Sequence, residues 1–224
     1  MLIVHHLNNS RSQRVLWLLE ELEVRYEIKR YQRGSDMLAP KELRDVHPLG
    51  KSPVITDNGN TIAESGAIVE YLVETYGNGR LMPPPKTPER LRYTYWLHYA
   101  EGSAMMPLVQ KLVFSVLPGR APVLVRPMFK FVMAQLLKNL VDPTLKRHMA
   151  FWEGELQKSE YFAGSQFTAA DIQMSFPLEA AASRAGLDNG THPKAMALLA
   201  KLQARPAYKR ALERGGPYAL ARVS

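Results

Sequence analysis

Two short stretches of the sequence carry groups that could hold a small extended ligand. The first is Lys51-Ser52-Pro53-Val54, in which Pro53 directly precedes a predicted strand and has no N–H to give to a sheet. If the Ser52–Pro53 bond is cis, Ser52 can offer its N–H and C=O to an extended ligand, as an added strand would. An ordinary proline at the entrance to a strand explains the same residues, so both interpretations stay open.

The second stretch, Glu64-Ser65, lies where a predicted hairpin ends and a helix begins. Backbone N–H groups at a helix start are unpaired and bind a carboxylate well. The Ser65 hydroxyl can add a donor, and Glu64 can accept a hydrogen bond from an ammonium group. The pair therefore suits an amino-acid head group that carries both charges, although simple helix capping by Ser65 is the alternative.

The loop Asn8-Asn9-Ser10-Arg11-Ser12 joins the first predicted strand to the first predicted helix. Ligands of open α/β sheets bind at the carboxyl ends of the strands. A hydroxyl group at this point could donate to a ligand thiolate and lower the pKa of the thiol. Ser10 is the first candidate, and Asn9 and Ser12 are alternatives, while helix capping would explain any of the three.

Composition limits what else the chain can do. The 224 residues include no cysteine, so any reactive sulfur must come from a ligand. The net charge of +8 comes without a basic arm, so we expect no nucleic-acid partner. There is no apolar run of membrane-spanning length and no signal-peptide pattern, which favours a cytoplasmic protein. We also expect no metal site, because the adjacent His5 and His6 would face opposite sides of a strand, and His98 and His148 have no ligand partners at metal spacing.

The first half of the chain alternates strand and helix patterns. Short β-branched or alternating runs predict strands, and apolar residues at helical spacing predict helices. The Asp57-Asn58-Gly59-Asn60 turn predicts a hairpin, because Asn-Gly accepts positive φ. The predicted order is β-α-β-α-β-β-α, with a parallel first pair of strands and an antiparallel last pair. The strands are expected at 2–4, 26–31, 54–55 and 61–63, and the helices at 15–22, 40–46 and 65–76.

The second half has a different pattern. Four prolines between residues 83 and 88 predict a linker, after which only helices are expected. Pro118 and Pro122 should interrupt the helical pattern, and Pro143 should bend it. Thr168 and Asp171 form a capping-box pattern, which we interpret as structural. The helices are expected at 89–106, at 129–156, from 167 onward, at 192–204 and at 206–214.

Taken in order, the motifs resemble those of the cytosolic glutathione transferases. They are HPLGKSPVI, DNGN, IAESGAIVEYL, the proline linker, FTAADI and RPAYKRALERGG, and together they extend over essentially the whole chain. Each motif is weak alone, but their order and spacing agree. NNSRSQRVLWLLEEL is similar to the bacterial and fungal serine-type, theta-like members.

The resemblance implies a thioredoxin-like, glutathione-binding domain at 1–80, a proline-rich linker at 81–88 and an all-helical domain at 89–224. It implies a homodimeric detoxification enzyme that conjugates the glutathione thiolate to electrophilic, apolar co-substrates. Two alternatives stay open: a glutathione-dependent disulfide or peroxide reductase, and a non-catalytic glutathione-binding or assembly module.

The resemblance also implies roles for individual residues. Counting back from Arg14-Val15, the family's sulfur-facing position falls on Asn9 rather than on Ser10, so the residue that faces the sulfur stays open between them. The implied glutathione-binding residues are Lys51, Ser52, Pro53, Glu64 and Ser65, with Lys51 near the glycine carboxylate and Lys41 or His47 as further candidates there. The implied border of the co-substrate pocket is Tyr99, Met105 and Met106.

Overall fold

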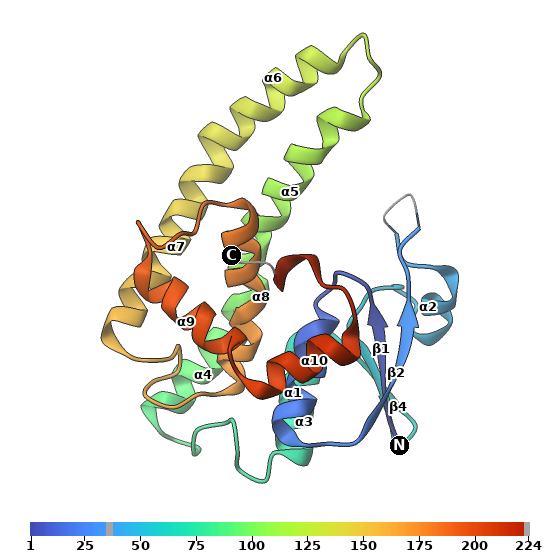
Figure 1. The fold of residues 1–224 in the computed structure, drawn as a ribbon, viewed down its shortest axis with the longest axis vertical. Helices are drawn as coiled ribbons and strands as arrows, with labels where there is room; N and C mark the ends of the chain where they lie inside the picture. The colour runs from blue at the N-terminus through green and yellow to red at the C-terminus, as the bar shows by residue number, and fades with distance from the viewer. Residues whose placement is uncertain (35–37, 222–224) are drawn as a thin grey trace.

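A computed structural model describes residues 1–34 and 38–221, and its first half contains a four-stranded mixed sheet (Figure 1). The strand order is β2-β1-β3-β4, with β1 parallel to β2 and antiparallel to β3, and with β3 and β4 forming a hairpin. The predicted order β-α-β-α-β-β-α and both predicted pairings are therefore confirmed. The elements are β1 (Leu2–Leu7), α1 (Ser12–Leu22), β2 (Tyr26–Tyr31), α2 (Lys41–Val46), β3 (Val54–Asp57), β4 (Asn60–Ala63) and α3 (Ser65–Tyr76).

The second half consists of helices joined by loops, with no strand among its described residues (Figure 1). Irregular chain separates Tyr76, where α3 ends, from Pro88, where α4 begins, and the Thr87 hydroxyl caps α4 by accepting from the Arg90 N–H at 3.2 Å. The elements are α4 (Pro88–Tyr99), a π-helical segment (Ala100–Ala104), α5 (Met105–Arg120), α6 (Arg126–Leu136), a second π-helical segment (Leu137–Val141), α7 (Asp142–Lys158), α8 (Ala169–Arg184), α9 (Pro193–Gln203), α10 (Pro206–Gly215) and a 3₁₀ turn (Ala219–Ala221).

The two halves share one hydrophobic core. Buried side chains of α1 and α3, such as Trp17 and Ile68, belong to the same cluster as Trp96 and Leu178 of the helical half. The Trp17 ring meets the Tyr208 ring of α10 edge to face, with 5.3 Å between ring centroids. Helix α2 lies on the opposite face of the sheet, where Leu43 forms a small separate cluster with Leu7 and Tyr31 of the strands.

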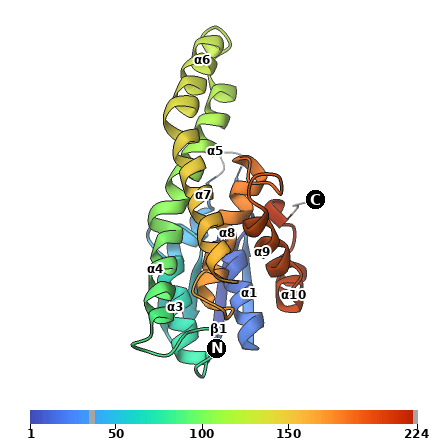
Figure 2. The same ribbon diagram turned by 90° about the vertical axis from the view of Figure 1, so that its left-hand side faces the viewer.

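The helical half departs from the prediction at Pro118. We expected this proline to interrupt a helix, but α5 continues to Arg120, and the chain turns only at Pro122. A proline removes one backbone N–H donor, and this loss matters least near a helix end, where ladder hydrogen bonds are already few. Helices α5 and α6 therefore form a long antiparallel hairpin that projects from the body of the protein (Figures 1 and 2).

The capping box predicted at the start of α8 is confirmed. The Asp171 carboxylate accepts from the Thr168 N–H at 2.8 Å, and the Thr168 hydroxyl accepts from the Ala170 N–H at 3.3 Å. Asp171 also accepts from the Phe162 N–H at 2.9 Å, so it ties the preceding loop to the helix. Burial raises the pKa of Asp171 to about 6, although these hydrogen bonds act to lower it.

We expect Asp171→Asn to lower the free energy of unfolding by about 2 kcal/mol, because an amide replaces one of two buried acceptor oxygens with a donor. Chemical denaturation of the purified variant would measure this loss. Thr168→Ala is the matched control, with an expected loss of about 1 kcal/mol for a single cap. Equal losses in the two variants would mean that the contact with Phe162 contributes nothing.

Candidate active site

A narrow cleft at the edge of the sheet brings together most of the predicted ligand-binding residues. Three chain segments meet there: the end of α2 with the loop into β3, the turn from β4 into α3, and the start of α1. The π-helical segment after α4 closes the remaining side. The lining residues are Arg11, His47, Leu49, Lys51, Ser52, Pro53, Ala63, Glu64, Ser65 and Glu101.

The Ser52–Pro53 peptide bond at the entrance to β3 is cis, as one of the two interpretations of the sequence expected. The Ser52 hydroxyl donates to the backbone carbonyl of His5 at 3.1 Å, which fixes the loop against β1. Pro53 itself is buried. This hydrogen bond therefore holds the backbone of Ser52 in place where the residue lines the cleft.

Ser10 lies beside Ser52. Its hydroxyl oxygen is 3.3 Å from the Ser52 hydroxyl and 2.7 Å from the Ser12 hydroxyl, and it accepts from the Ser12 N–H at 3.2 Å. Ser12 is completely buried and forms a 2.8 Å hydrogen bond with Nδ1 of His6. These contacts hold the Ser10 hydroxyl at the carboxyl end of β1, next to the cleft.

Asn9 points elsewhere. Its backbone has a φ of +49°, and its side-chain oxygen accepts from the Ala219 N–H at 2.8 Å, near the C-terminal end of the described chain. The structure thus places Ser10 against Ser52 and ties Asn9 to another segment. Arg11 occupies the N-cap position of α1 and makes no side-chain cap hydrogen bond, whereas the Ser10 hydroxyl accepts from the N–H of Ser12, the first residue of the helix.

Glu64 and Ser65, at the turn from β4 into α3, also line the cleft. Ser65 is the first residue of α3, one position past the N-cap, and no side-chain cap hydrogen bond forms at this helix start. Glu64 occupies the N-cap with a φ of +71°, a strained conformation for a residue other than glycine. Such strain concentrates at ligand sites, and the start of α3, where backbone N–H groups lack helical partners, borders the same cleft.

Arg11 and Glu101 are cleft residues that the sequence analysis did not assign. The Arg11 Nε lies 3.1 Å from a Glu101 carboxylate oxygen, and the buried Arg14 guanidinium pairs with the other oxygen. Burial raises the pKa of Glu101, but Arg14 and Arg11 outweigh this effect and leave the pKa below its usual value. Arg11 lies in the loop that also contains Asn9, Ser10 and Ser12, whereas Glu101 is 90 residues farther along the chain and belongs to none of the sequence motifs.

The remaining predicted residues fall into two groups. His47 and Lys51 line the cleft, while Lys41 is exposed on α2 and does not line it. Tyr99 ends α4, and Met105 and Met106 begin α5, so the three residues flank the π-helical segment that contains Glu101.

None of those three lines the cleft. The Tyr99 hydroxyl accepts from the Trp152 indole N–H at 3.0 Å and hydrogen bonds with His148. Met105 is buried in the core, and Met106 is 62 % exposed.

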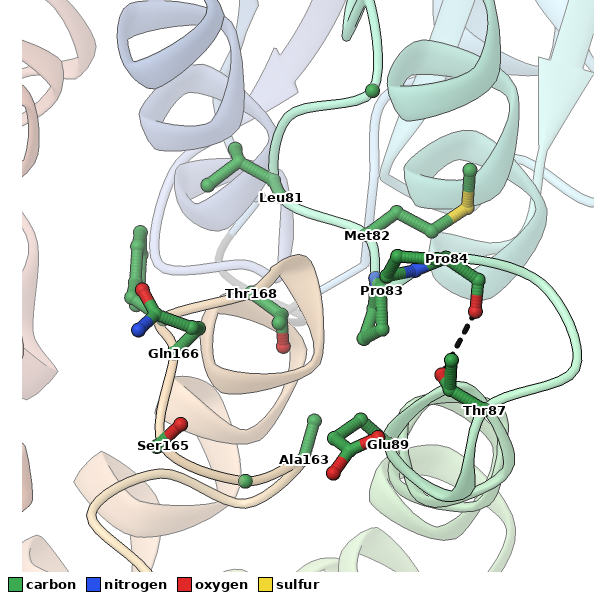
Figure 3. Close-up of a pocket in the computed structure, with 13 residues that line it drawn as sticks. Leu81, Met82, Pro83, Pro84, Thr87, Glu89, Ala163, Ser165, Gln166 and Thr168 are labelled. Carbon is green, nitrogen blue, oxygen red and sulfur yellow. Dashed lines mark hydrogen bonds between the residues drawn. The ribbon is translucent and has the colours of Figure 1, made fainter.

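A second cavity, of about 550 Å³, lies between the proline linker and the loop before α8 (Figure 3). Pro83 and Pro84 face Ala163 and Ser165 across it, and the Thr87 hydroxyl donates to the Pro84 carbonyl at 2.8 Å. Glu89 is the only ionisable side chain in its lining. The second cavity therefore lacks the charged groups of both signs that line the cleft, and it contains none of the predicted site residues.

Comparison with known proteins agrees with this geometry. Two family models match: the glutathione S-transferase N-terminal domain over residues 1–74 and the glutathione S-transferase C-terminal domain over residues 120–206. Glutathione S-transferase 3 of Schizosaccharomyces pombe is 39 % identical over 185 residues, covering 81 % of this chain and 74 % of that protein. Glutathione S-transferase 1 of Saccharomyces cerevisiae is 33 % identical over 189 residues, covering 81 % of each chain.

A solved structure shows the same similarity to glutathione S-transferases. The crystal structure of a glutathione S-transferase from Actinobacillus pleuropneumoniae superposes with a TM-score of 0.81 at 29 % identity, covering 100 % of this chain and 97 % of that one. The protein belongs to the glutathione S-transferase family of enzymes, with a thioredoxin-like N-terminal domain and a helical C-terminal domain. The family and fold implied by the sequence motifs are confirmed.

Proposed function

We propose that this protein conjugates the thiolate of glutathione to apolar electrophiles in the cytoplasm as part of detoxification, and that it works as a homodimer. In this reaction the glutathione thiol loses its proton, its sulfur forms a bond to an electrophilic carbon, and the leaving group departs. The observation that carries the proposal is the cleft itself, which combines an extended backbone edge, a helix start and charged groups of both signs.

The chemistry of glutathione matches each part of the cleft. The backbone of Ser52 beside cis-Pro53 would pair with the central cysteine, as an added strand does. Ser65 and the start of α3 would bind the γ-glutamyl carboxylate, and Glu64 would accept from its ammonium group. Lys51 and His47 would attract the glycine carboxylate, and Lys41 would contribute only from a greater distance.

We assign the sulfur-facing role to Ser10. Its hydroxyl lies 3.3 Å from the Ser52 hydroxyl, so a cysteine paired with Ser52 would place its sulfur nearby. Asn9 is the weaker candidate, because its side-chain oxygen is already bonded to the Ala219 N–H. Tyr99, Met105 and Met106 stay as the proposed border of the co-substrate site, since Glu101 lies between them in the chain and lines the cleft.

Purified protein, supplied with glutathione and an activated aryl halide, should form the thioether, and this can be followed by absorbance. Thioether formation that saturates with glutathione would support the proposal. Glutathione-dependent reduction of a disulfide or peroxide without thioether formation would replace it with the reductase alternative. Glutathione binding by calorimetry without either activity would indicate a binding module.

We expect Ser65→Ala to weaken glutathione binding about tenfold, or about 1.5 kcal/mol, because the ligand carboxylate loses one charge-assisted hydrogen bond. Isothermal titration calorimetry would measure the change in Kd. Ser115→Ala, at an exposed position of α5 far from the cleft in sequence, is the matched control and should leave Kd unchanged. An unchanged Kd in Ser65→Ala would remove Ser65 from the site.

A further inference from the structure

The hairpin of α5 and α6 is apolar on its outside. On α5, Val109, Leu112 and Val116 are each more than 40 % exposed although all are apolar. They recur with Val113 and Leu117 at a spacing of three and four residues, which places them in one stripe along the helix. On α6 a second stripe includes Met128, Phe131 and Val132.

The two stripes lie on opposite outer sides of the hairpin. A helix turns by about 100° per residue, so the less exposed Phe114 and Pro118 lie on the side of α5 opposite to its stripe. The less exposed Phe129 and Met133 lie on the side of α6 opposite to Met128 and Phe131 by the same count. The hairpin therefore partly covers one side of each helix and presents apolar side chains outward on both flanks.

The tip of the hairpin is its most exposed apolar part. Leu124 is 93 % exposed and Val123 is 77 % exposed, the two highest values among large apolar side chains in the described chain. The loop that carries them is held by Arg126, whose guanidinium donates to the Ala121 carbonyl at 3.3 Å. In both ribbon views this loop lies at the end farthest from the sheet (Figures 1 and 2).

Charge on the hairpin has a single sign. From residue 102 to residue 141 the sequence contains no aspartate or glutamate. Lys111 near the base pairs with Asp142 at 2.7 Å, and the other basic residues extend to the tip. These are Arg120, Arg126, Lys130 and Lys138.

We propose that the tip of this hairpin docks on an anionic lipid surface. Apolar side chains on both flanks and at the end of a projecting hairpin suit insertion into a surrounding apolar layer, whereas a single protein partner would cover one side. Arg120 and Arg126 flank the apolar loop, where they would meet lipid phosphates as the loop enters the headgroup region. No helix among the described residues is long and apolar enough to cross a membrane, so the docking is interfacial.

Flotation of the purified full-length protein with lipid vesicles tests this proposal. We expect binding to vesicles of equal parts phosphatidylcholine and phosphatidylserine, weaker binding to phosphatidylcholine alone, and loss of the difference at high salt. Leu124→Asp should reduce binding at least about tenfold, because a charge replaces an inserted leucine. Leu91→Asp, at a 74 % exposed leucine near the start of α4, is the matched control and should bind like the unmodified protein.

Two further measurements complete the test. The double variant Arg120→Gln/Lys130→Gln should lose the preference for phosphatidylserine. We expect each removed basic residue to lower the affinity for phosphatidylserine-containing vesicles about fivefold. Both leucine variants should keep transferase activity. Light scattering should show that both also keep the number of subunits of the unmodified protein. Absence of vesicle binding by the unmodified protein, equal loss in Leu91→Asp, or a smaller assembly in Leu124→Asp would overturn the proposal, and the last result would show that a second copy covers the tip.

Discussion

We expect Ser10→Ala to lower kcat/KM for the transfer reaction at neutral pH by about 30- to 100-fold. A hydroxyl that donates a hydrogen bond to a thiolate stabilises the thiolate by about 2–3 kcal/mol. Removal of the hydroxyl should therefore raise the pKa of the bound thiol by about 1.5–2. The location of Ser10 beside Ser52 supports this role. The absorbance of the bound thiolate as a function of pH, together with the pH profile of kcat/KM, would measure the change.

Asn9→Gly is the matched variant. Glycine accepts the φ of +49° at this position, so the substitution removes the side chain without adding backbone strain. Because the Asn9 side chain binds the Ala219 N–H, we expect the pKa of the bound thiol to stay unchanged. A raised thiol pKa in Asn9→Gly together with an unchanged value in Ser10→Ala would reverse the assignment.

The second large effect concerns stability. We expect Glu101→Gln to lower the free energy of unfolding by about 3 kcal/mol, because the Arg14 guanidinium would lose its carboxylate while staying buried. The Arg14 side chain is only 2 % exposed, so water cannot replace the lost partner. Its other hydrogen bond, to the Gln173 carbonyl at 2.6 Å, does not neutralise the charge. Denaturant titration of the purified variant would give the value.

Glu160→Gln provides the comparison for this prediction. Glu160 pairs with Lys201 on the surface, where both side chains are largely exposed, and such pairs contribute at most about 1 kcal/mol. We therefore expect little change in the free energy of unfolding. If Glu101→Gln were no more destabilising than Glu160→Gln, the buried Arg14 would not depend on Glu101.

Local patterns in the sequence predicted most of the fold. The Asn-Gly turn, the alternation of the strands and the proline linker each depend on residues that are close together in the chain, so their physical causes can be recognised without the structure. The Thr168–Asp171 cap was recognised for the same reason. Pro118 was misjudged because the cost of a proline depends on its distance from the helix end, and that end was not marked in the sequence.

Short motifs in the sequence also predicted several of the residues that line the cleft. Lys51, Ser52, Glu64 and Ser65 belong to short motifs at the ends of predicted strands, and the topology of the sheet brings such ends together. All four line the cleft.

Only the tertiary structure distinguishes the surroundings of Ser10 and Asn9, the two candidates to face the sulfur, and shows which groups complete the cleft. Ser10 and Asn9 are neighbours, and both could donate a hydrogen bond. The structure distinguishes them because the side chain of Asn9 is hydrogen-bonded to the 3₁₀ turn near the C-terminus. Glu101 enters the cleft from the helical half through a π-helical segment, held there by the buried Arg14. Contacts across 87 or 210 residues depend on how the two halves pack, and no local pattern of residue types encodes that packing.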